Sequence, residues 1–114
     1  MPCREGTLAH VKGFIMNKLF EKECFGRGRS HRKHMTVRNL RGGYDPQHHG
    51  LFDQAIRELE SEGLVHTFPA RTGGGTDEHI VAVIDRLPDA RALMNLYRRS
   101  VKLRPLRPDL KEFS

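Results

Sequence analysis

The sequence of 114 residues contains no tryptophan, two tyrosines and only two cysteines. Cys3 and Cys24 are too few for the disulfide framework of a small secreted domain. No stretch approaches the roughly 20 consecutive apolar residues that span a membrane, and residues 1–8 do not contain the apolar run of a signal peptide. We therefore expect a cytoplasmic protein with an aliphatic core and no membrane partner.

The length of the chain limits its organisation, because domains cluster near about 100 to 150 residues. Hydrophobic residues make up 37% and charged residues 30% of the chain, which suits one small core of helices and a hairpin. We predict a single domain over residues 1–103. Residues 104–114 contain two prolines and little that can pack, so a flexible tail is expected there.

Acidic residues are absent from residues 27–43, although the whole chain contains 14 of them and has a formal net charge of +6. Such a basic segment favours phosphate-rich partners, since the guanidinium group of arginine matches the geometry of phosphate oxygens. The six cations of the segment are expected to contact nucleic-acid phosphates: Arg27, Arg29, Arg32, Lys33, Arg38 and Arg41. The alternative interpretation is a solvated loop without a ligand.

The first half of the chain predicts two helices. Thr7 is expected to cap the first helix, which should end near Gly26. Gly13 lies inside this helix at a cost of about 1 kcal/mol relative to alanine, so another element is expected to pack closely against it. An exposed loop should follow over residues 26–34, and Thr36 can cap a short second helix.

A third helix is predicted from Asp45 as its cap and Pro46 as its first residue to a left-handed stop at Gly63. Its apolar side consists of Phe52, Ala55, Ile56 and Leu59. The opposite side consists of Gln47, Gly50, Gln54, Arg57 and Ser61. Gln47, Gln54 and Arg57 are candidate base-reading residues, because amides pair with adenine and guanidinium groups with guanine. Alternatively, they form only a solvated side, with Arg57 bound to a neighbouring side chain.

A β-hairpin is predicted after the third helix. Residues 64–68 form its first strand, Pro69 marks an edge or an end, and the second strand is apolar on both sides. The glycine-rich tip is expected over residues 71–76. Three tip residues could touch nucleic-acid backbone or a minor groove: Arg71, Thr72 and Thr76. The alternative is a tip without contacts.

A last helix is expected after Asp89 as its cap. One side of it is apolar, with Leu93, Leu96, Tyr97 and Val101. This stripe is a candidate seam for a homodimer. The alternative is packing against the first helix of the same chain.

The order of helix, short helix, helix ending in ELESEGLV and hairpin resembles the winged helix-turn-helix superfamily over residues 6–84. The basic loop, the GGYDPQHHG turn and the LESEGLV exit are similar to small uncharacterised archaeal winged-helix proteins. The resemblance implies an α+β winged helix-turn-helix fold with an additional C-terminal helix and a surface that faces nucleic acid. Asp53 and Glu58 depart from it, since they flank the exposed side where phosphate-contacting residues would be expected.

Neither a cofactor nor catalysis is expected. Cys24, His31 and His34 lack a fourth ligand for a structural zinc site, and the TGGGT segment lacks the lysine of a phosphate-binding loop. We therefore predict a non-enzymatic transcription regulator that binds duplex DNA. The alternative is an RNA- or ribosome-associated winged helix or a protein-interaction adaptor, which the acidic third helix fits slightly better.

Overall fold

The computed structural model describes residues 6–26, 34–44, 46–72 and 75–103, with only the backbone described for Thr72. In chain order the elements are α1 (Leu8–Glu21), β1 (Phe25–Gly26), β2 (Met35–Thr36), α2 (Val37–Gly42), a 3-10 turn (Pro46–His48), α3 (His49–Ser61), β3 (Val65–Thr72), β4 (Gly75–Val83), a second 3-10 turn (Ile84–Arg86) and α4 (Leu87–Ser100). Four α-helices and four strands within these ranges confirm the expected α+β class. The expected tail over residues 104–114 lies outside them.

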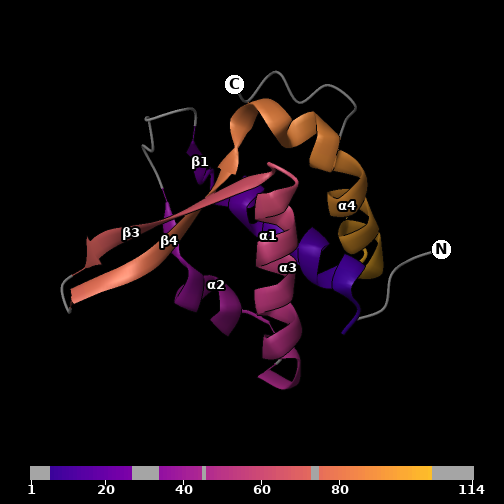
Figure 1. Cartoon of the computed structure of the whole chain (residues 1–114). Helices are drawn as coiled ribbons and strands as arrows, with labels where there is room; N and C mark the ends of the chain where they lie inside the picture. Colours follow the sequence, from indigo (N-terminus) through magenta and orange to yellow (C-terminus); the bar gives the residue numbers. More distant parts are fainter. Residues whose placement is uncertain (1–5, 27–33, 45, 73–74, 104–114) are drawn as a thin grey trace.

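Strand β4 is the centre of the sheet. Strand β3 pairs with it antiparallel from Val65↔Ala82 to Thr72↔Gly75, which builds the long hairpin that projects from the body in Figure 1. The two-residue strands β1 and β2 pair with β4 on its other edge, parallel and antiparallel respectively. These pairings bury Ile80, Val81 and Ala82 completely.

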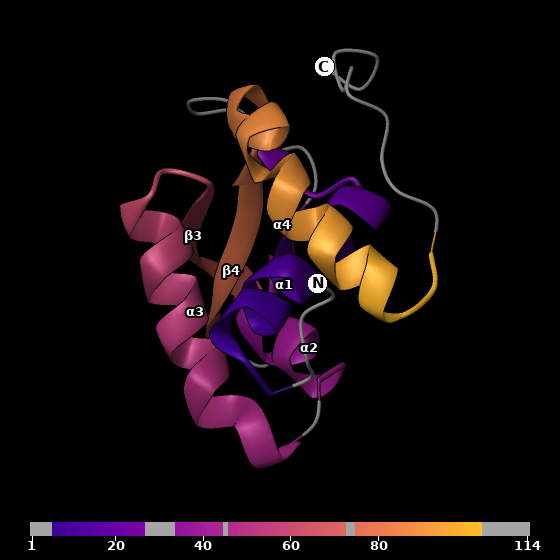
Figure 2. The ribbon, with the colours of Figure 1, turned by 90° about the vertical axis from the view of Figure 1, so that its right-hand side faces the viewer.

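Helix α1 is the centre of the helical layer. It contacts both α3 and α4, and Figure 2 shows it between them. Its buried residues Phe14, Ile15 and Leu19 join Phe52 of α3 and Met94 of α4 in one core. Gly13 is the point of closest approach, because an added Cβ would stand 2.5 Å from the Leu93 carbonyl oxygen of α4. The close packing expected at this glycine is confirmed.

Two predicted helix caps are confirmed. The Thr7 hydroxyl accepts a hydrogen bond from the His10 N–H at 3.3 Å, and the Thr36 hydroxyl accepts one from the Asn39 N–H at 3.0 Å. The predicted end of the first helix near Gly26 is wrong, since α1 ends at Glu21. The chain turns there, and β1 then pairs with β4 over Phe25, predicted as the end of the helix, and Gly26, predicted as the start of the loop.

The predicted starts of the third and last helices are also wrong. Pro46 opens a 3-10 turn, and α3 begins only at His49, with His48 rather than Asp45 as its cap residue. Helix α4 begins at Leu87, two residues before the predicted cap Asp89. A 3-10 turn leads directly into α4 and places its proline in the first turn, where a missing N–H breaks no helical hydrogen bond.

The hairpin is longer and its tip narrower than predicted. Strand β3 continues through Pro69 to Thr72, and β4 begins at Gly75. The Thr67 N–H binds Glu60 of α3 rather than β4, so odd-numbered residues of β3 direct their amide groups to the free edge. Pro69 is tolerated inside the strand because its missing N–H falls on that edge, which confirms its predicted edge character.

Candidate nucleic-acid interface

The two sides of α3 are divided as the sequence predicts. Phe52, Ala55, Ile56 and Leu59 are buried. The five residues of the opposite side are all exposed: Gln47, Gly50, Gln54, Arg57 and Ser61. We call this set the outer side of α3. It consists of amide, guanidinium and hydroxyl groups and a glycine, which admits a close neighbour because nothing lies within 4 Å of a Cβ added at Gly50.

Lys12 of α1 binds two carboxylates, one in α3 and one on the C-cap residue of α3. Its Nζ lies 3.0 Å from Glu58 Oε1 and 2.6 Å from Glu62 Oε1. Burial disfavours the charge of Lys12, but the hydrogen bonds to Glu62 and Glu58 outweigh burial and raise the pKa of Lys12. Hydrogen bonds from Lys12 and then from Gln54 lower the pKa of Glu58. Lys12 therefore joins α1 to the second half of α3 through an ion cluster.

The other flank of α3 also has its carboxylates bound within the chain. Asp53 Oδ1 lies 3.4 Å from Arg41 Nη2 of α2. Glu60 Oε2 accepts hydrogen bonds from the Thr67 N–H at 3.0 Å and from the Thr67 hydroxyl at 2.6 Å. With 100° between successive residues, Asp53 and Glu60 lie on one flank of the outer side and Glu58 on the other.

The described cations of the basic segment are on α2. Arg38 pairs with Asp77 of β4, and Arg41 pairs with Asp53 of α3. Figure 1 shows α2 and the hairpin on the same side of α3, away from α4. The Arg38 side chain remains 72% exposed, so this surface pair contributes at most about 1 kcal/mol and can exchange for a phosphate. The remaining predicted phosphate contacts lie outside the described residues: Arg27, Arg29, Arg32 and Lys33.

The predicted hairpin contacts are at the far end of the sheet. Arg71 and Thr76 are exposed and face each other in the register of β3 and β4. Thr72 has its backbone in β3, opposite Gly75, and its side chain lies outside the described part of the chain. Neither Arg71 nor Thr76 forms a hydrogen bond or an ion pair through its side chain with another described residue, so both are open to a ligand.

The candidate dimer stripe is partly used within the fold. Leu93 and Tyr97 pack against α1 at Gly13, which is the alternative that the sequence left open. Leu96 is half-buried, and Val101 at the end of α4 is 43% exposed. Only the end of the stripe is therefore open to another chain.

Sequence analysis missed a cluster of rings on the sheet surface that faces away from the helices. His66 and Phe68 of β3 are near parallel, with ring centroids 5.9 Å apart, and Phe68 is near parallel to His79 of β4 at 6.0 Å. His34 Nδ1 lies 2.7 Å from His79 Nδ1. We call His34, His66, Phe68 and His79 the ring cluster. The sequence did contain one indication of this cluster. His66 and Phe68 are two residues apart in a predicted strand, and such residues share a face of the sheet.

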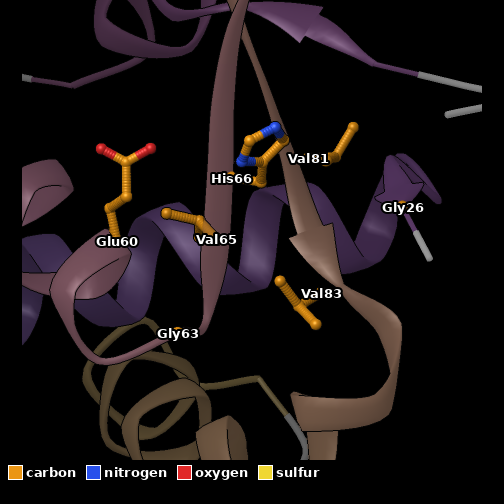
Figure 3. A pocket seen from close by; sticks show the side chains of 7 residues that line it. All are labelled: Gly26, Glu60, Gly63, Val65, His66, Val81 and Val83. Carbon is orange, nitrogen blue, oxygen red and sulfur yellow. The ribbon is translucent and has the colours of Figure 1, made fainter. Parts of the chain in front are cut away.

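A hollow of about 370 Å³ adjoins the ring cluster at His66. Figure 3 shows His66 above Val65 and Val83, with Glu60 on one side and Val81 on the other. The lining residues are Gly26, Glu60, Gly63, Val65, His66, Val81 and Val83. Among the described residues, no three histidine, cysteine or carboxylate side chains are grouped so that they could hold a metal ion.

Comparisons with known proteins add no relative: no family model, no curated protein and no solved structure matches this chain. Within the described ranges, no helix is both long and apolar enough to cross a membrane.

Proposed function

We propose that the chain is a winged-helix protein that binds duplex DNA and regulates transcription in the cytoplasm. The order of α1, α2, α3 and hairpin supports this proposal, since α3 then takes the place of the helix that enters the major groove. Strands β3 and β4 form the wing, and α4 is an addition to the winged-helix core. No catalysis is proposed.

One observation carries the proposal: the carboxylates that flank the outer side of α3 are already bound to partners within the chain. Lys12 holds Glu58 and Glu62, and Arg41 holds Asp53. The three carboxylates of α3 and that of its C-cap residue Glu62 are thus bound within the chain, and the outer side itself contains none. This removes the main electrostatic objection to placing α3 beside phosphates.

The proposed contacts divide into those that read bases and those that hold the backbone. Gln47, Gln54 and Arg57 of the outer side would read base edges, at about 1 to 3 kcal/mol for each well-formed bidentate pair. The basic segment and the wing would hold phosphates through Arg27, Arg29, Arg32, Lys33, Arg38, Arg41, Arg71, Thr72 and Thr76. Phosphate contacts raise the affinity for all sequences alike.

A selection from random duplex DNA, followed by affinity measurements at several salt concentrations, tests the proposal. Arg57→Ala should weaken binding to the selected sequence by about tenfold or more and leave binding to unrelated duplexes nearly unchanged. Arg99→Ala is the matched control, because it removes an exposed arginine from α4, on the far side of α1. Failure to enrich any duplex sequence, with tighter binding to transcripts in a parallel assay, would favour the RNA-associated alternative.

A further inference from the structure

We propose that Glu58 is a positioning residue, which fixes the side-chain amide of Gln54 so that the outer side of α3 selects adenine. This role rests on the duplex binding proposed above, because only a bound duplex would present base edges to Gln54. Glu58 itself would touch no base. It would determine which bases are accepted by determining which end of the amide faces the DNA.

Glu58 lies between Lys12 and Gln54, and each of its carboxylate oxygens is used by one of them. Oε1 lies 3.0 Å from Lys12 Nζ, and Oε2 accepts a hydrogen bond from Gln54 Nε2 at 3.0 Å. The hydrogen bonds from Lys12 and then from Gln54 lower the pKa of Glu58. The Lys12 side chain is only 12% exposed and is bound to Glu62 as well, so it attaches the Glu58 carboxylate to α1.

The carboxylate of Glu58 determines the orientation of the Gln54 amide. An ionised carboxylate only accepts hydrogen bonds, and only the NH₂ group of an amide donates them. Nε2 of Gln54 must therefore face Glu58, which directs Oε1 away from that flank of the helix. Gln54 is exposed on the outer side of α3. Its amide oxygen is thus the end that meets a base.

A fixed acceptor distinguishes bases by the groups that they present in the major groove. Adenine and cytosine present an amino group there, whereas the polar groups of guanine and thymine are acceptors. The second hydrogen of Nε2 remains for N7 of adenine, and cytosine has no acceptor at that place. We therefore expect Gln54 to prefer adenine, then cytosine, and to reject guanine and thymine.

Arg57 should read the neighbouring base pair. It is exposed, and its side chain forms no hydrogen bond or ion pair with another described residue. A guanidinium group only donates hydrogen bonds and therefore suits N7 and O6 of guanine. Gln54 and Arg57 are about 4.5 Å apart along the helix axis, which is close to the spacing of about 3.4 Å between stacked bases. A guanine should therefore adjoin the adenine.

The alternative is that the bond between Gln54 and Glu58 only stabilises α3, as bonds between side chains four residues apart can do. Glu58→Gln separates the two roles, because it keeps the shape of the side chain but replaces the carboxylate with an amide. An amide at this position can donate as well as accept. Gln54 could then turn either end outward and would also accept thymine or guanine.

Selection from random duplex DNA tests the role of Glu58, and Gln54→Ala identifies the base position that Gln54 reads. The original protein should prefer adenine to thymine there by about tenfold, and Glu58→Gln should reduce this preference to about twofold or less. The preference for the neighbouring guanine should remain. Glu62→Gln is the matched control, because it removes the other carboxylate bound to Lys12 and leaves the bond between Glu58 and Gln54. Its preference for adenine should be unchanged.

Two further measurements separate positioning from misfolding and from a failure of duplex binding. Chemical denaturation checks that each variant is folded. In NMR spectra of the free protein, the side-chain amide signals of Gln54 should shift in Glu58→Gln and stay in place in Glu62→Gln. Unshifted signals in Glu58→Gln, its full preference for adenine, or an equal loss in Glu62→Gln would overturn the role of Glu58 and leave duplex binding standing. Enrichment of no duplex sequence by the original protein would overturn both.

Discussion

Three residues end α1, α3 and α4 in the left-handed conformation: Glu23 with φ of 55°, Gly63 with φ of 77° and Lys102 with φ of 60°. The same hydrogen bond closes each helix. The residue after the left-handed one donates its N–H to a carbonyl of the helix, as Cys24 donates to the Leu19 carbonyl at 2.9 Å. Glycine adopts this conformation without the steric cost that a Cβ adds. Two of the three positions therefore carry strain.

Substitution of Glu23 by glycine should stabilise the protein. Glu23 is exposed, so little is lost with its side chain, while removal of the Cβ relieves about 1 kcal/mol of left-handed strain. Part of this gain is offset by the greater freedom of glycine in the unfolded chain. We expect a net gain of about 0.5 kcal/mol in chemical denaturation. Gly63→Ala is the opposite control and should destabilise, because an alanine at a φ of 77° would carry the left-handed strain that glycine avoids.

Gly13 should not accept a methyl group, although alanine is the better helix former by about 1 kcal/mol. The added Cβ would meet the Leu93 carbonyl oxygen at 2.5 Å and the Tyr97 Cβ at 2.7 Å, and backbone cannot move aside as a flexible side chain can. We expect Gly13→Ala to lower the free energy of unfolding by about 1 to 3 kcal/mol. Gly50→Ala in α3, where nothing lies within 4 Å, should be neutral or stabilising. Equal stability of the two variants would contradict close packing of α1 and α4.

At the scale of elements, the Lys12 cluster joins α1 to α3 and should make stability depend on pH. The pKa of Glu58 is lowered from its ordinary value of 4.5, so its contribution is complete above that value and is lost as the pH falls through the folded value. The pKa of Lys12 is raised from its ordinary value of 10.5, so its contribution is complete below that value and is lost as the pH rises through the folded value.

The test compares the original protein with Lys12→Met, which keeps the apolar stem but not the charge. The difference in free energy of unfolding should be constant between about pH 5 and pH 10 and shrink on both sides. High salt should reduce it only in part, because the Lys12 side chain is only 12% exposed. A difference that does not change with pH would mean that Lys12 stabilises through its packing alone.

The sequence predicted the elements whose causes are local in the chain better than those that depend on pairing with distant residues. The caps Thr7 and Thr36 and the stop at Gly63 act within one turn, and these predictions are confirmed. Strands β1 and β2 have two residues each, too short for any periodic pattern, and they exist because β4 offers a second edge. The hollow at His66 was likewise hidden, since it combines residues from β1, the end of α3 and the hairpin.

At the scale of the whole molecule, α4 completes the core. The position of each residue of its apolar stripe in that core determines how much stability is lost when glutamate replaces it. Leu93 is half-buried against α1, whereas Val101 is 43% exposed at the end of the helix. Leu93→Glu should cost about 2 kcal/mol or more, because a carboxylate would lose water without gaining a partner. Val101→Glu should change the stability by no more than about 0.5 kcal/mol.

Light scattering and thermal unfolding of the same samples separate packing from self-association. If α4 serves only the core, the original protein and Val101→Glu have the mass of one chain, and Leu93→Glu melts about 8 °C lower or more. A homodimer through the open end of the stripe would instead give twice that mass, halved by Val101→Glu with the fold intact. Full stability of Leu93→Glu with a reduced mass would show that α4 leaves α1 to pair with another chain.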